Sequence, residues 1–226
     1  MAAHTKIIDL FGIPACGKST LSNFICDHYG SELKICTMPQ LVSEARKDGN
    51  RLRKALSIGY FLAGIRLRLH APFDKKHREI PIMNWPSHAR YYSYAKKYSG
   101  YDVVLVDHGD IQDFVSLERG VDLHSDSRFS KACSHYIDRS LSDVYVYCKI
   151  DPEIALLRMQ SRGRETGRID TMGGETERLQ ALEKESSRFA FYAEMLRGKE
   201  NVLLELDMNS PVEQIAATLM NQIKTL

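Results

Sequence analysis

The sequence predicts an α/β protein, a three-layer sandwich in which helices cover both faces of a five-stranded, mostly parallel sheet. Five short β-prone runs alternate with helical runs along the chain. The run 102–107 (DVVLVD) is apolar up to its closing aspartate, which is typical of a strand buried on both faces. The chain has 226 residues, of which 43% are apolar, so one core can form and we expect a single domain over 1–226.

The predicted strands are short runs rich in β-branched and other apolar residues. They cover residues 6–11, 33–37, 102–107, 143–150 and 202–207. A glycine-containing loop interrupts the pattern after the first strand, and a helical stretch follows that loop. The chain therefore begins with a strand, a loop and a helix.

The predicted helices fill the intervals between the strands. Segment 51–70 repeats apolar residues at helical spacing and is expected to form one long helix. Asp151 and Pro152 are favourable residues for opening another helix. The other helices are expected at 21–29, 39–47, 87–99, 110–118, 127–140, from the end of the 161–174 loop to about 197, and 211–224. The intervals 70–86 and 161–174 are expected to be loops.

Charge is distributed unevenly along the chain. The net charge of +2 argues against a protein that wraps nucleic acid through bulk charge. Segment 46–100 nevertheless contains 13 Lys or Arg against three Asp or Glu, a net charge of +10, so the remainder of the chain carries −8. This basic helical segment indicates either an anionic ligand or only a solvated helix surface.

Cysteine usage and apolar run length indicate the compartment. The five cysteines form no CxxC pair, and a chain of this size does not need disulfides for stability, so we expect reduced thiols in the cytoplasm. The longest apolar run, 58–65, is far shorter than the roughly 18 residues of a membrane-spanning helix. No secretory signal and no membrane association are expected.

The strongest motif lies between the first strand and the first helix. Residues 12–19 read GIPACGKS and match GxxxxGK[ST], the phosphate-binding P-loop (Walker A motif), in its required strand-to-helix context. Backbone N–H groups would bind phosphates, Lys18 would reach the β- and γ-phosphates, and Ser19 would ligate magnesium. The motif predicts the P-loop-containing nucleoside triphosphate hydrolase fold, with ATP and Mg²⁺ as cofactors. The candidate ATP-binding residues are Gly12, Ile13, Pro14, Ala15, Cys16, Gly17, Lys18, Ser19 and Thr20.

Further candidate residues for the same site are an aspartate at the end of a strand and a cysteine within the motif, and each has an alternative explanation. Asp107 ends an apolar strand, where P-loop proteins place a second carboxylate toward magnesium, although Asp-His-Gly-Asp also favours a turn. Asp110 is the fallback carboxylate. Cys16 precedes Gly17 and is either a reactive thiol or simply a small side chain.

The glycine-rich loop 161–174 is a candidate lid. It carries Arg162, Arg164 and Arg168, and Arg158 lies one helical turn before Arg162. Arginines on a closing lid can neutralise the charge that spreads over a transferred phosphoryl group. Surface arginines on such loops are also common, and the presence of the P-loop is what favours a catalytic role for Arg162, Arg164 and Arg168. Lys18 and Asp107 are the other candidate catalytic residues.

Four segments together resemble the nucleoside and nucleotide kinase superfamily, nearest the thymidylate kinases and deoxynucleoside kinases. They follow the order of that superfamily over nearly the whole chain, and only the P-loop is highly specific alone. The segments are the loop 12–19, VVLVDHGD at 103–110, KIDPEIALLRMQSRGRETGR at 149–168 and VLLELDMNSPVEQIAATL at 202–219.

The resemblance implies an ATP site at the P-loop, an arginine-bearing lid at about 161–174 and an acceptor site over the strand ends. Adenine would lie between the base of the lid and residues 208–210. In thymidylate kinases, a helix similar to residues 55–70 supplies an arginine to the phosphate of the acceptor. Arg66 and Arg68 are therefore candidate substrate-binding residues, and the basic segment 46–100 becomes the acceptor-side region.

The chain departs from the pattern of these kinases at two positions. Deoxynucleoside kinases carry Glu-Pro, and thymidylate kinases Arg-Glu-Pro, after the second strand, whereas this chain has Met38 before Pro39. The arginine that usually follows the acid of the third strand is replaced by His108. An acceptor that is already a phosphate needs no general base, which favours a monophosphate slightly.

Our leading hypothesis is an ATP- and magnesium-dependent transfer of the γ-phosphoryl group to a nucleoside or nucleoside monophosphate. One alternative is a P-loop kinase for another small molecule or a polynucleotide end. A second is a non-catalytic ATP-binding regulatory module, consistent with both departures. The tyrosines among the basic residues of 90–101 could stack on the bases of a nucleic acid. The favoured interpretation is an amphipathic helix whose tyrosines are partly buried in the core. Homodimerisation is left open.

Overall fold

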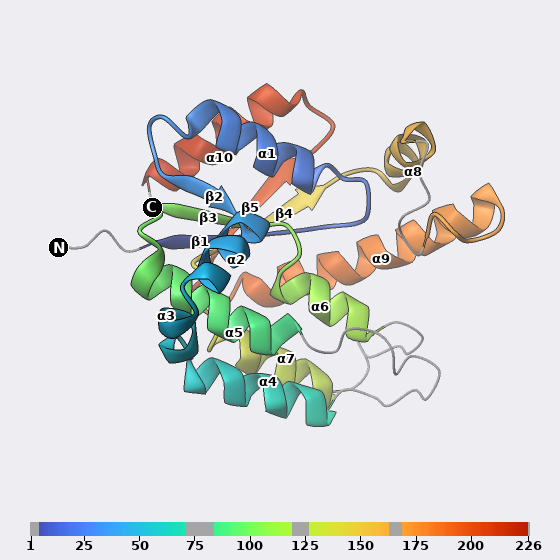
Figure 1. The fold of residues 1–226 in the computed structure, drawn as a ribbon. Coiled ribbons are helices and arrows are strands. Elements are labelled where there is room, and N and C mark those ends of the chain that lie inside the picture. Colours follow the sequence, from blue (N-terminus) through green and yellow to red (C-terminus); the bar gives the residue numbers. More distant parts are fainter. Residues whose placement is uncertain (1–4, 71–83, 119–126, 163–168, 226) are drawn as a thin grey trace.

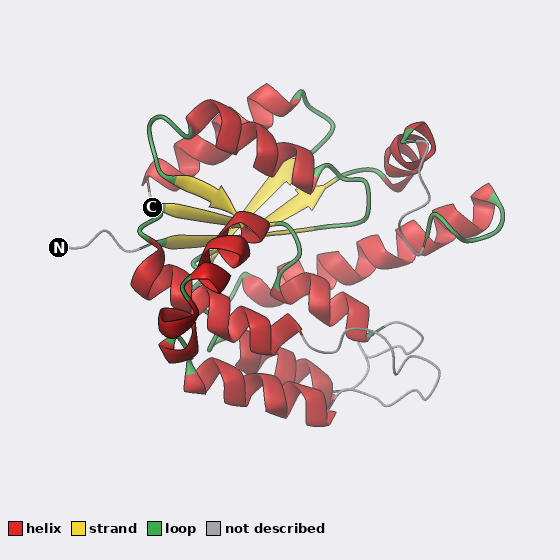
Figure 2. Ribbon diagram, in the orientation of Figure 1, coloured by secondary structure: helices red, strands yellow, loops and turns green. Residues whose placement is uncertain are grey.

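The computed structural model describes residues 5–70, 84–118, 127–162 and 169–225. Its centre is a five-stranded sheet in which every strand pair is parallel, with the strand order β2-β3-β1-β4-β5 (Figures 1 and 2). The strands are β1 (Lys6–Phe11), β2 (Ile35–Thr37), β3 (Val103–Val106), β4 (Val144–Lys149) and β5 (Val202–Asp207). The α/β class and the five-stranded parallel sheet are therefore confirmed.

Strand β1 is the central strand, between β3 and β4. Its Asp9 is in register with Val106 of β3 and with Tyr145 of β4. Because all strands are parallel, their carboxyl ends meet at one edge of the sheet. The loop after Phe11 and the loop after Val106 consequently lie at the same edge, and this edge carries the candidate site.

Helices cover both faces of the sheet (Figure 1). One face is covered by α1 (Lys18–Tyr29) and α10 (Val212–Thr225), which pack on each other. The other face is covered by α2 (Met38–Lys47), α5 (Asn84–Tyr94), α6 (Asp110–Leu117) and α9 (Glu175–Leu196). Helices α4 (Ile58–His70) and α7 (Ser127–Ile137) pack together beyond α5 and α6, farther from the sheet, while α8 (Pro152–Ser161) follows β4.

The prediction of one helix over 51–70 was wrong. Two helices occupy the segment, α3 (Gly49–Lys54) and α4, with residues 55–57 between them. The Ser57 hydroxyl accepts a hydrogen bond from the Tyr60 backbone N–H at 3.5 Å, so this serine acts as a helix N-cap. The apolar spacing continues across the break, which is why periodicity alone did not reveal it.

Other boundaries differ by a few residues. Helix α1 begins at Lys18, inside the phosphate-loop motif, rather than at residue 21. Helix α5 begins at Asn84, within the predicted 70–86 loop, and continues as one π-helical turn, Ala95–Ser99. Most of that loop lies outside the described residues. The other elements begin and end close to their expected positions.

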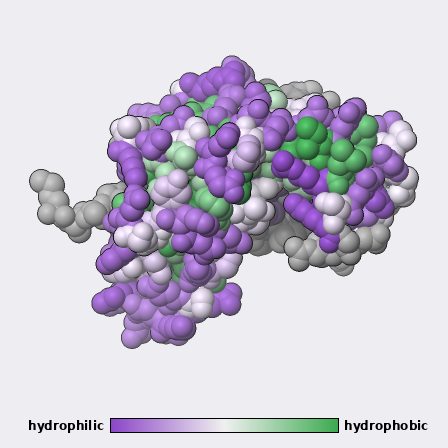
Figure 3. Space-filling model, turned by 90° about the horizontal axis from the view of Figure 1, so that it is seen from above, coloured by the Kyte–Doolittle hydropathy of each residue, from purple (hydrophilic) through white to green (hydrophobic). Residues whose placement is uncertain are grey.

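The core consists of the sheet and the helix faces that cover it. Leu10, Val104 and Val146 are fully buried, as parallel strands between two helical layers should be. In the view from above, the surface is mostly hydrophilic and its clearest hydrophobic area lies over α8, where Ile154 and Leu157 are exposed (Figure 3). None of the described helices has the length and apolar character needed to cross a bilayer.

Candidate functional site

The loop after β1 has the backbone geometry of an anion-binding turn. Gly12, Ala15 and Gly17 have positive φ angles of 150°, 64° and 105°, and α1 begins at the next residue, Lys18. A Cβ atom on Gly12 would lie only 2.6 Å from the carbonyl oxygen of Cys148, so the loop requires glycine there. Positive φ angles and the following helix N-terminus are the features that turn backbone N–H groups toward a phosphate.

Lys18 folds over this loop. Its Nζ donates to the carbonyl oxygens of Gly12 at 2.8 Å and Ile13 at 3.3 Å, and it lies 3.4 Å from Sγ of Cys16. The lysine is half-buried, so its ammonium group is held at the mouth of the loop. A phosphate at the loop would find a fixed cation beside the backbone donors.

Ser19 and Asp107 are joined across the edge of the sheet. The Ser19 hydroxyl donates to Oδ2 of Asp107 at 2.7 Å, although the residues are 88 positions apart in sequence. The structure thus brings together the two residues proposed to hold magnesium. A hydroxyl and a carboxylate supply the hard oxygen ligands that Mg²⁺ prefers, so this pair fits the ion.

The thiol of Cys16 is buried beneath the loop. A hydrogen bond from the Cys148 thiol is the main cause that lowers the pKa of Cys16, and the charge of Lys18 lowers it further, against the opposing effect of burial, to about 5. Both thiols are almost completely buried. All five cysteines are free, as expected.

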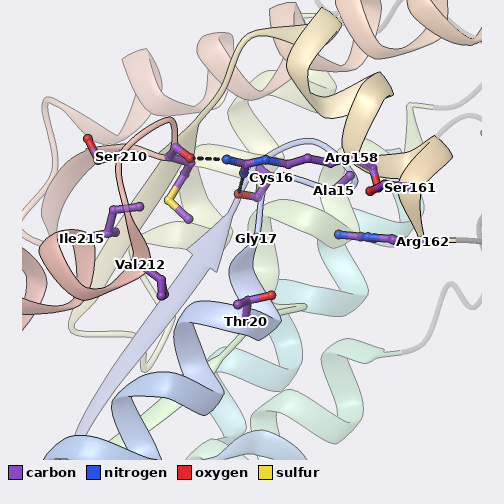
Figure 4. Close-up of a pocket in the computed structure, with 11 residues that line it drawn as sticks. Ala15, Cys16, Gly17, Thr20, Arg158, Ser161, Arg162, Ser210, Val212 and Ile215 are labelled. Atoms are coloured by element: carbon purple, nitrogen blue, oxygen red, sulfur yellow. Dashed lines mark hydrogen bonds between the residues drawn. The ribbon is translucent and has the colours of Figure 1, made fainter.

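A pocket of about 310 Å³ opens beside the loop, between α8, α1 and the segment after β5. Arg158, Ser161 and Arg162 line its α8 side, and Figure 4 shows them facing residues of α1 and of the segment after β5. The remaining lining residues are Ala15, Cys16, Gly17, Thr20, Met208, Ser210, Val212 and Ile215. The base of the expected lid and residues 208–210 therefore do enclose a space next to the phosphate loop.

Arg158 connects the two sides of this pocket. Its guanidinium donates to the carbonyl oxygens of Cys16 at 3.3 Å and Met208 at 2.9 Å (Figure 4). In the sequence this arginine stands out only by its position one helical turn before Arg162. Of the lid arginines, Arg162 is exposed at the pocket, whereas Arg164 and Arg168 lie outside the described residues.

Asp110 is unsuited to the role of fallback carboxylate, because it is completely buried. Five side chains donate to it or face it within hydrogen-bond distance: Tyr60, His88, Tyr136, Ser140 and Tyr145. They come from α4, α5, α7, the loop after α7 and β4. Asp110 at the start of α6 therefore ties the helical layers to the sheet.

His88 carries the balancing charge of this cluster. Its Nδ1 lies 3.3 Å from Asp110 and 3.8 Å from Asp113. Burial alone would lower the pKa of His88, but the hydrogen bond to Asp110 and the charge of Asp113 raise it. Burial opposes ionisation of Asp110, yet the hydrogen bond and charge of His88 lower its pKa. Both shifts favour the charged forms of the two buried side chains.

Sequence reasoning missed Asp9 and the groups around Asp110. Asp9 is fully buried, and its Oδ2 accepts the backbone N–H of Asp110 at 2.8 Å. The sequence contained one signal for Asp9: in the strand 6–11 (KIIDLF), every other residue after Lys6 is apolar. The tyrosines and His88 gave no signal, because their convergence depends on how four separate segments pack.

The other predicted residues lie on α4, at the start of α2 and in the loop after β3. Arg66 is exposed and Arg68 is half-buried on α4, and their contact with a substrate stays a prediction. Met38 opens α2 directly after β2, as the resemblance implied. His108 is exposed beside Asp107, and its Nε2 lies 3.9 Å from Asp113. Within the described residues, no group of three or more His, Cys, Asp or Glu has the arrangement of a metal site.

Comparison with known proteins adds evidence on the fold. No protein-family model matches the sequence, and no curated protein matches it. Among solved structures, three of a deoxyadenosine kinase from M. mycoides match over 97% of this chain. The complex with dCTP has a TM-score of 0.56 and 15% sequence identity, and the match covers 100% of its chain. The complex with dATP has a TM-score of 0.53 and 18% sequence identity, and the match covers 99% of its chain. The complex with the products dCMP and dCDP has a TM-score of 0.52 at 16% identity over 98% of its chain.

The chain has the fold of a P-loop nucleoside kinase. The match extends over nearly the full length of both chains, so it is not confined to the phosphate loop and the sheet. The predicted likeness to this superfamily is thereby confirmed for the fold. Within the nucleoside kinase fold, the phosphate loop, the Ser19–Asp107 pair and the α8 pocket lie at the carboxyl edge of the sheet.

Proposed function

We propose that the protein is an ATP- and magnesium-dependent phosphotransferase that moves the γ-phosphoryl group of ATP to a nucleoside or nucleoside monophosphate. The observation that carries the proposal is the hydrogen bond between Ser19 and Asp107 beside a P-loop with its lysine in place. Such a loop with two oxygen ligands is the arrangement that phosphoryl transfer uses. The nucleoside kinase fold supports the acceptor class.

Each part of the site has a role in this proposal. Backbone N–H groups of 12–19 bind the phosphates, and Lys18 leaves the carbonyl oxygens of its loop to contact the β- and γ-phosphates. Ser19 and Asp107 hold magnesium, which neutralises phosphate charge when bound. Arg162, with Arg164 and Arg168 outside the described residues, stabilises charge on the transferred group.

The pocket beside α8 is the proposed place for the adenine base. Met208, Val212 and Ile215 give it apolar walls, and Arg158 fixes its two sides relative to each other. A mostly apolar cleft with a few polar groups is typical of a base-binding site. The adjoining phosphate loop would then receive the triphosphate of the same nucleotide.

The acceptor is proposed from chemistry and from the neighbours. The M. mycoides enzyme is a deoxyadenosine kinase whose structures contain dATP, dCTP, or dCMP with dCDP as products. Nucleosides and their monophosphates are therefore the first acceptors to try. Met38 occupies the position of the usual carboxylate, and a phosphate acceptor would need no base there.

The experiment is ADP release from ATP and Mg²⁺ in the presence of a panel of deoxynucleosides, ribonucleosides and their monophosphates. Stimulation by a panel member, absent with Lys18→Ala, would establish the activity and the acceptor together. Tight ATP binding without stimulation by any member would reject the nucleoside kinase proposal. That result would favour another acceptor or a regulatory ATP-binding module.

A further inference from the structure

Asp9 occupies an unusual place for a carboxyl group. It lies in the middle of the central strand, in register with Val106 and Tyr145, and none of its surface is exposed. Its neighbours in the strand, Ile8 and Leu10, are fully buried as well. A polar group buried at this depth lowers stability unless its hydrogen bonds compensate. Among the described residues Asp9 Oδ1 has no hydrogen-bond partner, so burial of this side chain gives no net advantage to the core alone.

What the carboxyl group does contact is the segment that follows Asp107. Its Oδ2 accepts the backbone N–H of Asp110 at 2.8 Å. A Cβ atom on Gly109 would lie 2.2 Å from the same oxygen, so the carboxyl group rests directly against the Gly109 backbone. The φ angle of Gly109 is −107°, which other residues adopt readily. Space next to Asp9, rather than backbone conformation, is therefore what excludes a side chain at position 109.

These contacts lie close to the candidate catalytic edge. Asp107 is two residues before Gly109, and its carboxylate accepts the Ser19 hydroxyl at 2.7 Å. The start of α6 thus contacts Asp9 of β1, while Asp107 contacts Ser19 at the start of α1. A small movement of the 108–110 backbone would carry Asp107 away from Ser19.

We propose that Asp9 is a positioning residue of the site: its carboxyl group fixes the backbone at Gly109 and Asp110 and thereby holds Asp107 beside Ser19. The inference rests on the proposed function only in taking Ser19 and Asp107 as the residues that hold magnesium. Asp9 contacts neither nucleotide nor metal in this account. It acts through one hydrogen bond and one close backbone contact.

The contact depends on an acceptor oxygen rather than on a negative charge. Burial raises the pKa of Asp9 well above its usual range, and repulsion from the Asp110 carboxylate raises it further. The positioning contact needs only an acceptor oxygen of the right shape facing the Asp110 N–H. An asparagine supplies the same oxygen without charge, so Asp9→Asn should preserve the contact, whereas Asp9→Ala removes it.

Calorimetric binding of ATP, with Mg²⁺ and with EDTA in its place, tests the inference without requiring turnover. In the presence of Mg²⁺, Asp9→Ala should bind ATP about tenfold more weakly than the wild type, the lower range for loss of a group that orients a metal ligand. Asp9→Asn should remain within about twofold of the wild type. In EDTA, all three proteins should bind ATP equally. Unchanged Mg²⁺-dependent binding in Asp9→Ala, or equal weakening in Asp9→Asn, would overturn the inference.

Gly109→Ala provides an independent test if Asp9→Ala does not fold. Its methyl group would collide with the Asp9 carboxyl group, so we expect the same selective weakening of ATP binding in Mg²⁺. In the double variant Asp9→Ala/Gly109→Ala the collision is relieved, and the loss should be smaller than the product of the two separate losses. A folded Gly109→Ala protein with wild-type binding in Mg²⁺ would refute the inference.

Failure of this inference is distinguishable from failure of the proposed function. If no acceptor stimulates ADP release but the variants show the Mg²⁺-selective pattern, Asp9 positions the site of an ATP-binding module and the kinase proposal fails. If an acceptor is found and the variants bind Mg²⁺ and ATP like the wild type, the kinase proposal stands and the inference about Asp9 fails.

Discussion

Lys18 illustrates how much of a site can depend on one residue without contributing much to the fold. Within the described part of the chain, the hydrogen-bond partners of its ammonium group are the carbonyl oxygens of Gly12 and Ile13 and the sulfur of Cys16, all in its own loop. A cation that bonds only to its own loop adds little to the free energy of unfolding, because those carbonyl oxygens also accept hydrogen bonds from water. The same cation is the main side-chain partner proposed for the β- and γ-phosphates.

Lys18→Ala should therefore separate function from stability. We expect acceptor-dependent ADP release to fall by at least about a hundredfold, because positioned charge supplies most of the stabilisation in phosphoryl transfer. The melting temperature should change by only a few degrees, as for other partly exposed substitutions. Lys184→Ala, an exposed lysine on α9, is the matched control and should leave both quantities unchanged. Turnover by Lys18→Ala at the wild-type rate would exclude the role given to the phosphate loop.

At the scale of elements, the start of α6 is the point where the layers meet. The Asp110 carboxylate lies within hydrogen-bond distance of side chains from four elements: Tyr60 of α4, His88 of α5, Tyr136 of α7 and Tyr145 of β4. Removing a partner from such a buried cluster leaves groups unpaired, which is more costly than the loss of one ordinary hydrogen bond. The orientation of α4 and α5, which belong to the basic segment 46–100, is thereby linked to the segment that bears Asp107.

The His88–Asp110 pair should make stability depend on pH in a defined direction. Because the pKa of His88 is raised in the folded protein, its contribution is fully present below the usual histidine pKa of about 6.5 and is lost as pH rises through the higher folded value. The lowered pKa of Asp110 acts oppositely, and its contribution is lost only as pH falls through that value. The contribution of this pair to the free energy of unfolding should therefore decline as pH rises above about 6.5.

His88→Gln is the variant that tests this assignment. It should remove this contribution, so the stability of the wild type relative to His88→Gln should fall as pH rises through the folded pKa of His88. Denaturant unfolding of both proteins over a series of pH values measures it, with His135→Gln on α7 as the control that keeps the wild-type profile. If the pH profile of His88→Gln parallels that of the wild type, the pKa of His88 does not differ between the folded and the unfolded protein.

The elements also show what the sequence could and could not predict. The strands, the phosphate loop and the neighbourhood of Ser19 and Asp107 follow from local patterns and from the rule that parallel strands share an edge. The division of 51–70 into two helices could not be predicted in this way, because the apolar residues keep their helical spacing across the break that the N-cap at Ser57 marks. Asp9 and His88 could not be placed either, since their partners come from strands and helices distant in sequence.

The molecule as a whole is polarised in charge. The segment 46–100 has a net charge of +10, whereas the rest of the chain carries −8. In so far as it is described, this segment runs from the end of α2 through α3, α4 and α5, on one side of the sheet. A basic region beside a site attracts anions over distances of about a Debye length, about 8 Å at physiological ionic strength. Under the proposed function this asymmetry concerns the acceptor, because ATP is bound from the side of α1 and α8.

Salt dependence can therefore report the charge of the acceptor. At saturating ATP and Mg²⁺, kcat/KM for a nucleoside monophosphate should fall severalfold, about three- to tenfold, when ionic strength is raised from low to high values. For an uncharged nucleoside it should change little, since no long-range attraction is screened. Arg53→Glu, an exposed residue of α3 inside the basic segment, should reduce the slope for the monophosphate, whereas Lys184→Glu on α9 should not. Equal slopes for charged and uncharged acceptors would show that the basic segment is only a solvated surface.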